Sequence, residues 1–215
     1  MLRLSDRYLD ELVDAFDICP FARGARKSGQ VARRVLHARA PELAAGLSAI
    51  AELEADPKIV IGLLIFPRLT IAPAAFDRLL NELREADLAR RQASDRGAPR
   101  APFAMAAFHP DAPYGDESPQ RMVSFFRRSP DPTIQLVRFD ALDAVKARGT
   151  PGGAFFFEFS AAGWAELERR TAELPVSERI TRDNHATARR EGIARLQSIY
   201  DDIAADRART YAKFV

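Results

Sequence analysis

The stretch KIVIGLLIF at residues 58–66 decides the fold of this chain. It is nearly continuous in Ile, Val and Leu, and it stops at Pro67. An apolar run of this length predicts a strand, and the lack of alternating polar residues is typical of a strand covered on both faces. Apolar residues at helical spacing predict helices on either side of it, over 41–54 and 74–91. A strand enclosed by helices indicates an α/β sandwich.

The same alternation continues outward from this region. The other predicted elements are helices over 5–17, 141–146 and 161–174, and strands over 31–38, 103–108, 133–139 and 154–159. We therefore expect a two-layer or three-layer α/β sandwich of about four to five strands with helices between them.

The last part of the chain has a different composition. From residue 176 onward it is rich in Arg, Asp and Ala, and one apolar stripe runs through it. This pattern predicts one long amphipathic helix or two in series. We expect an α/β domain over 1–175 and a helical extension over 176–215, which packs on the domain or on a partner subunit as a homodimer.

Composition excludes several classes of protein. The 215 residues carry 32 basic and 30 acidic side chains, and the basic ones are dispersed, which argues against nucleic-acid binding. No apolar run is long enough to span a membrane, and residues 1–6 lack the apolar stretch of a secretory signal. The one cysteine excludes an internal disulfide and suits a reducing cytoplasm.

Three unusual phrases stand apart from the rest of the sequence. They are CPFA at 19–22, AFHP at 107–110 and RRSPDPT at 127–133. In this order they resemble the domain of unknown function 1415 family, a bacterial family, over residues 5 to 145. The chain departs from the family pattern at Phe66, where the family has His before Pro, and at Arg127, where it has Asn. The resemblance implies a site built from these phrases without naming its reaction.

Cys19 is the first candidate catalytic residue. A thiolate is a good nucleophile and a good metal ligand, whereas most lone cysteines are small buried hydrophobes. Cys19 follows the predicted helix over 5–17, and the negative end of a helix disfavours an anion. Arg23 and Arg26 could offset this effect if they fold back.

His109 is the second candidate catalytic residue, because it ends a predicted strand. Ligands of open α/β sheets bind at the carboxyl ends of strands, where an imidazole can act as a general base. The alternative is a histidine that hydrogen-bonds the backbone and closes the strand end. If the two strands are parallel, Phe66 would form the wall of a pocket beside His109.

Arg127, Arg128 and the adjacent Ser129 are the candidate substrate-binding residues. Two guanidinium groups could bind a carboxylate or phosphate by bidentate hydrogen bonds, or one of them could hold the Pro-rich loop instead. Residues 110–120 predict a long irregular loop, in which Tyr114, Asp116 and Glu117 could serve as a lid.

His185 suggests a metal site. Together with Cys19 and His109 it would provide ligands that suit zinc or iron, and a haem with Cys19 as its ligand is a related alternative. No short spacing links the three residues, so only the fold can bring them together.

We therefore carry three functional hypotheses forward. The first is a cytoplasmic enzyme that acts on a small anionic metabolite, in a pocket of Cys19, Phe66, His109, Arg127 and Arg128. The others are a metal or haem protein and a non-catalytic assembly protein that uses its C-terminal helix. The chain has no Walker loop, GxGxxG, GxSxG or HExxH motif, which removes the commonest nucleotide, hydrolase and zinc-protease interpretations.

Overall fold

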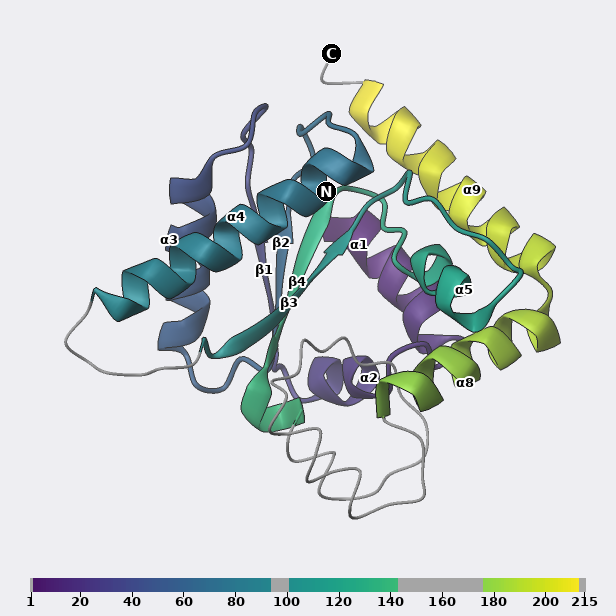
Figure 1. Cartoon of the computed structure of the whole chain (residues 1–215). Coiled ribbons are helices and arrows are strands. Elements are labelled where there is room, and N and C mark those ends of the chain that lie inside the picture. The colour runs from purple at the N-terminus through teal and green to yellow at the C-terminus, as the bar shows by residue number, and fades with distance from the viewer. Residues whose placement is uncertain (1, 94–100, 143–175, 213–215) are drawn as a thin grey trace.

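The computed structural model describes residues 2–93, 101–142 and 176–212 (Figure 1). The strand expected over 154–159, the helix over 161–174 and most of the helix over 141–146 lie outside these residues. Residues 139–142, where that last helix begins, are helical.

A mixed four-stranded sheet forms the centre of the described structure. Its order is β1-β2-β4-β3, with β1 at Val31–Val35, β2 at Ile61–Ile65, β3 at Phe103–Phe108 and β4 at Thr133–Arg138. β1 and β2 are parallel, and β4 is antiparallel to both β2 and β3. The first three strands therefore run the same way, and their carboxyl ends share one edge of the sheet with the start of β4.

Helices α3 (Leu43–Ala55) and α4 (Pro73–Gln92) cover one face of the sheet (Figure 1). We call this the packed face. Its core joins side chains of both helices to Leu64, Ile134 and Leu136 of the strands.

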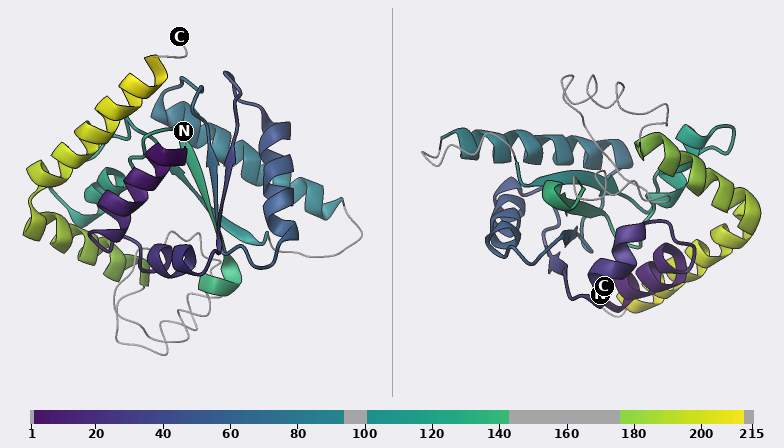
Figure 2. Two further views of the ribbon diagram at one scale, coloured as in Figure 1. Left: turned by 180° about the vertical axis from the view of Figure 1, so that it is seen from behind. Right: turned by 90° about the horizontal axis from the view of Figure 1, so that it is seen from below.

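The opposite face is covered by helices from both ends of the chain (Figure 2). They are α1 (Leu2–Tyr8), the π-helix η1 (Leu9–Asp14), α2 (Pro20–Lys27), α5 (Pro119–Phe126), α8 (Val176–Glu191) and α9 (Ile193–Tyr211). We call this the cavity face. Ile61, Leu63 and Ile65 of β2 point into its core. Helices on both faces confirm the α/β sandwich and explain why β2 is apolar throughout.

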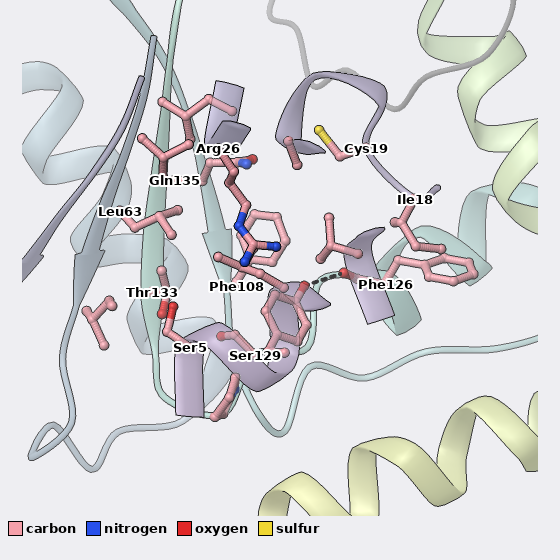
Figure 3. Close-up of a pocket in the computed structure, with 18 of the residues that line it drawn as sticks. Ser5, Ile18, Cys19, Arg26, Leu63, Phe108, Phe126, Ser129, Thr133 and Gln135 are labelled. Carbon is pink, nitrogen blue, oxygen red and sulfur yellow. Dashed lines mark hydrogen bonds between the residues drawn. The ribbon is translucent and has the colours of Figure 1, made fainter. Parts of the chain in front are cut away.

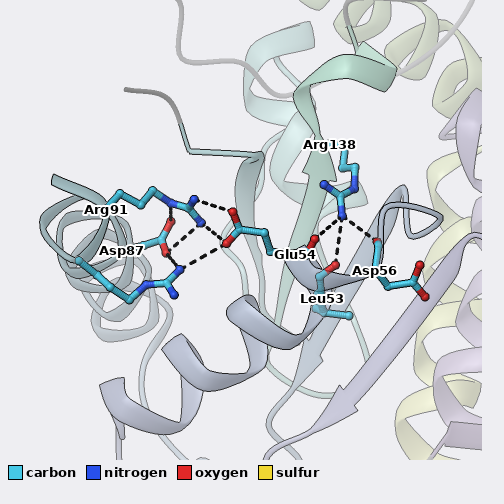
Figure 4. Close-up of polar contacts among 7 residues, drawn as sticks. Leu53, Glu54, Asp56, Asp87, Arg91 and Arg138 are labelled. Carbon is cyan, nitrogen blue, oxygen red and sulfur yellow. Dashed lines mark hydrogen bonds and ion pairs between the residues drawn. The ribbon is translucent and has the colours of Figure 1, made fainter. Parts of the chain in front are cut away.

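Two arginine clusters hold α3 in place (Figure 4). Arg138 of β4 donates to the carbonyls of Leu53, Glu54 and Asp56, at 3.2, 3.0 and 2.8 Å. These carbonyls lie at the C-terminal end of α3, where the helix has no N–H donors of its own to satisfy them. Arg91 of α4 pairs with Glu54 at 2.6 Å and with the fully buried Asp87 at 2.8 Å.

The C-terminal extension consists of two helices in series. Gly192, at φ 84°, separates α8 from α9, a backbone conformation that glycine adopts without strain. α9 packs along α1, where Arg7 pairs with Asp202 and Asp206 at 2.6 and 2.8 Å. None of the helices in the described ranges combines the length and apolar character of a bilayer span.

The first helix differs from its prediction. The helical segment over 5–17 begins earlier, becomes a π-helix at Leu9 and ends in a turn in which Asp17 has φ 55°. Two short helices, α2 and α5, were not predicted. Each has proline at its first position, after Cys19 and Ser118 respectively, and such a proline is a signal for a helix start.

Candidate functional site

A cavity lies on the cavity face, between the sheet and the first helices (Figure 3). Its volume is about 70 Å³, which is room for several water molecules or a short apolar group. Most of the lining is apolar, and includes Leu9, Val13, Ile18, Leu63 and Phe126. It is therefore suited to the apolar part of a small molecule.

All three sequence phrases contribute to this cavity. Cys19 and Ala22 come from the first phrase, Phe108 from the second, and Ser129, Pro130, Asp131 and Thr133 from the third. The register of the β-sheet brings the second and third phrases together, because Phe108 is paired with Thr133 and both side chains face α1 and α2. Residues more than a hundred positions apart thus line one hollow.

Cys19 occupies the N-cap of α2, with extended backbone angles of φ −132° and ψ 106°. Cys19 follows the first helical segment as predicted, and it also begins a second helix that was not predicted. The positive end of the α2 dipole favours a thiolate at this position. The side chain is only partly buried, and it lines the cavity.

Two polar side chains enter the cavity wall from the sheet and from α8. Gln135 of β4 is half-buried, and Asn184 of α8 is 8% exposed. Neither side chain forms a hydrogen bond with any of the described residues. Their amide groups are therefore available to hydrogen-bond water or a ligand.

Ser129, Thr133 and Tyr8 of the lining have partners. Ser129 Oγ and Thr133 Oγ1 both donate to the Asp131 carbonyl, at 2.6 and 2.8 Å. Tyr8 donates from its hydroxyl to the Phe126 carbonyl at 3.2 Å, and burial raises its pKa well above the usual value. Tyr8 is therefore a neutral hydrogen-bond donor and not a base.

Asp131 connects the cavity to the end of the chain. Its carboxylate is 3% exposed and accepts from Arg207 Nε and from the Tyr211 hydroxyl of α9, each at 2.6 Å. α9 is thereby fastened to the loop that supplies Ser129 and Thr133.

His109 lies on the opposite side of the sheet from Cys19. It is 5% exposed and contacts Phe76 of α4, with 5.8 Å between ring centroids. Its Nδ1 accepts from the Asp111 amide at 3.1 Å, so Nε2 carries the proton and donates to the Ile71 carbonyl at 3.0 Å. Burial lowers the pKa of His109, although the bond to Ile71 acts in the opposite direction. The imidazole is neutral and both nitrogens are engaged.

The expectation of one pocket for Cys19 and His109 is thus wrong in its geometry. Successive strand residues point to opposite faces, so Phe108 faces the cavity and His109 faces away from it. Phe66 does lie at the same sheet edge as His109, as parallel strands predict. Phe76 packs against both rings, however, and fills the space between them.

The two candidate arginines also separate. Arg128 lies over the rings of Tyr114, Phe125 and Tyr200, at 4.9, 4.5 and 4.2 Å from their centroids, and donates to Gln197. It therefore joins the predicted lid loop to α5 and α9. Arg127 is buried toward α4, and burial lowers its pKa to about 10. Neither guanidinium lines the cavity, whereas Ser129 does.

A family comparison agrees with the phrases that line the cavity. The model of a family described as "Protein of unknown function (DUF1415)" matches residues 2–151. The chain belongs to the DUF1415 family. No curated protein and no solved structure matches it. The match includes all three phrases, while Asn184, Arg207 and Tyr211 come from beyond the DUF1415 region.

The proposed metal ligands do not come together. Within residues 2–93, 101–142 and 176–212, no group of three His, Cys, Asp or Glu side chains is arranged to hold an ion. His185 is half-buried on α8, and His109 is on the packed face. The predicted set of Cys19, His109 and His185 is therefore not a preformed site.

Sequence reasoning missed Gln135 and Asn184. Gln135 stands between Ile134 and Leu136, and a polar residue inside an apolar strand was a usable signal. Asn184 had no such signal, because only the packing of α8 brings it to the cavity.

Proposed function

We propose that the protein is an enzyme that acts on a small, mainly apolar molecule held in the cavity, with Cys19 as its nucleophile. The observation that carries this proposal is that all three phrases of the DUF1415 pattern, including the only cysteine, line one hollow.

The lining supports a ligand of this kind. Apolar side chains form most of the wall, while Gln135 and Asn184 supply hydrogen-bonding groups without partners among the described residues. A cavity with a few convergent polar groups in an apolar wall is the usual form of a small-molecule site.

The position of Cys19 supports thiol chemistry. The α2 N-terminus favours the thiolate, and the lining offers no free imidazole to serve as a base, so the thiol releases its proton to solvent. The reaction we infer is acyl transfer. The sulfur forms a bond to a carbonyl carbon while the leaving group departs with its electron pair, and water later hydrolyses the thioester.

The soluble ester p-nitrophenyl butyrate tests this proposal. We expect release of p-nitrophenolate and a mass increase of one butyryl group on the protein, both of which are lost in Cys19→Ser. Ala22→Leu keeps the thiol and fills the cavity, so it should also stop the reaction. His109→Gln is the matched control outside the cavity and should react like the wild type.

Two outcomes contradict the proposal. If Cys19→Ser releases p-nitrophenolate at the wild-type rate, Cys19 is not the nucleophile. Unchanged labelling in Ala22→Leu shows that the thiol reacts from solvent and that the cavity has no part in it.

We also place the protein in the cytoplasm, because a single cysteine without a disulfide partner suits a reducing compartment.

A further inference from the structure

A second hollow lies directly beside the cavity. It is a groove of about 390 Å³, lined by Leu9, Asp14, Arg23, Arg26, Lys27, Val31 and Arg33. Leu9, Arg26 and Val31 line both the groove and the cavity, so the two spaces share a wall. Figure 3 shows the Arg26 side chain reaching in among the cavity residues.

The groove has an excess of positive charge. Arg26 pairs with Asp10 and Asp14, each at 2.5 Å, and Arg33 pairs with Asp6. The other two cations of the groove, Arg23 and Lys27, have no carboxylate partner among the described residues. Arg23 donates only to the Asp14 carbonyl.

These two cations are arranged to act together. They are four residues apart on α2, so they project from the same side of the helix. Asp14 is the only acid in the groove wall, and Arg26 neutralises its carboxylate, although Asp14 Oδ1 is buried without a hydrogen-bond partner among the described residues. An anionic group would therefore bind best between Arg23 and Lys27. A hydrogen-bond donor of the same ligand could bind Asp14 Oδ1.

A ligand of the usual size would need both spaces. A cavity of about 70 Å³ is small for a ligand site, and the adjoining groove extends it into the usual range of several hundred Å³. Cys19 is the N-cap of α2 and Lys27 is its last residue, so the backbones of the two residues are about 12 Å apart along the helix.

We propose that the cavity and the groove together bind an amphipathic anion, with a short acyl chain in the cavity and an anionic head group on Arg23 and Lys27. This inference rests on the proposed function, since it places the acyl chain in the cavity of Cys19. The inferred substrate is again an anion, as the sequence suggested. Its charge is bound in the groove, because the cavity lining is mainly apolar.

Isothermal titration of the full chain with hexanoate and with 1-hexanol tests the head group separately from the chain. We expect hexanoate to bind about tenfold more tightly than 1-hexanol, because two exposed charge contacts together contribute at most about that much. The double variant Arg23→Gln/Lys27→Gln should lose this advantage while its affinity for 1-hexanol stays unchanged. Arg39→Gln/Lys58→Gln is the matched control, since it removes the same charge from exposed residues outside the groove.

The outcomes separate this inference from the proposed function. Equal affinity for both probes, or an equal loss in both double variants, overturns the anion site and leaves the cavity proposal standing. If neither probe binds and p-nitrophenyl butyrate does not acylate Cys19, the cavity proposal itself fails.

Discussion

The two faces of the sheet are built to different standards of packing. On the packed face, a methyl group added at Gly62 would lie 2.7 Å from Leu53 Cδ1, so no space remains there. On the cavity face, the same strands border a hollow of about 70 Å³ into which Gln135 points. One sheet therefore has a filled side and an incompletely filled side.

This difference separates stability from function. The packed face gains free energy from close contact of apolar side chains, and His109 is part of that packing. The cavity face gives up some of that energy and holds polar groups without described partners, which a purely structural core avoids. We therefore look for the chemistry on the cavity face.

The largest effect is expected from truncation in the packed face. Phe76→Ala removes a fully buried ring that contacts both Phe66 and His109, so we expect a loss of about 4 kcal/mol in the free energy of unfolding. Urea denaturation measures it. The exposed Leu88 of the same helix is the control, and Leu88→Ala should change stability by less than about 0.5 kcal/mol. A loss below about 1 kcal/mol for Phe76→Ala would show that this face is not tightly packed.

The next effect concerns the connection between the cavity and α9. Asp131→Asn removes the buried charge that binds Arg207 and Tyr211, and we expect a loss of about 2 kcal/mol. Hydrogen exchange should become faster in α9 and stay unchanged in α4. If α9 keeps its protection, Asp131 does not hold the helix.

A smaller and more direct test adds volume to each face. Gly62→Ala should cost about 1–2 kcal/mol, because its new methyl meets Leu53 and Leu136. Ala22→Leu adds more volume on the cavity side and should cost less than about 0.5 kcal/mol, since its side chain enters open space. Thermal or urea denaturation compares the two, and a reversed order would abolish the distinction between the faces.

The smallest effect is a pH dependence from His109. Its pKa is lower in the folded protein than the usual 6.5, so the unfolded chain binds the proton first as the pH falls. The contribution of neutral His109 is complete above about pH 6.5 and is lost below it, so the free energy of unfolding decreases on acidification. His109→Gln, which keeps a donor for Ile71, should reduce the difference between about pH 7.5 and about pH 5.5. Identical pH profiles for the variant and the wild type would mean that this imidazole does not titrate on unfolding.

Much of the fold followed from local patterns. The strand at 103–108 was predicted at its observed bounds, and β2 was recognised from its continuous apolar run. The short helices α2 and α5 were missed, because each is only eight residues long and no periodicity is visible over such a length. Their proline starts were the better signal.

The structure brings only some of the predicted site residues together. Cys19 and Ser129 line the cavity, while His109, Phe66, Arg127 and Arg128 do not. His109 was misplaced by a single position, because neighbouring residues of a strand point to opposite faces. The two arginines separate where α5 ends, because Arg127 is the C-cap of that helix and Arg128 begins the loop that leads to β4.

The order of amino acids was sufficient to specify the α/β class and the main strands, because these depend on local periodicity and on composition, and the three phrases stood out through their resemblance to a family pattern. It could not specify which side of the sheet each polar group faces, or that Asn184, Arg207 and Tyr211 return to the same site. Those facts depend on contacts between residues distant along the chain, and such contacts exist only after the helices have packed on the sheet.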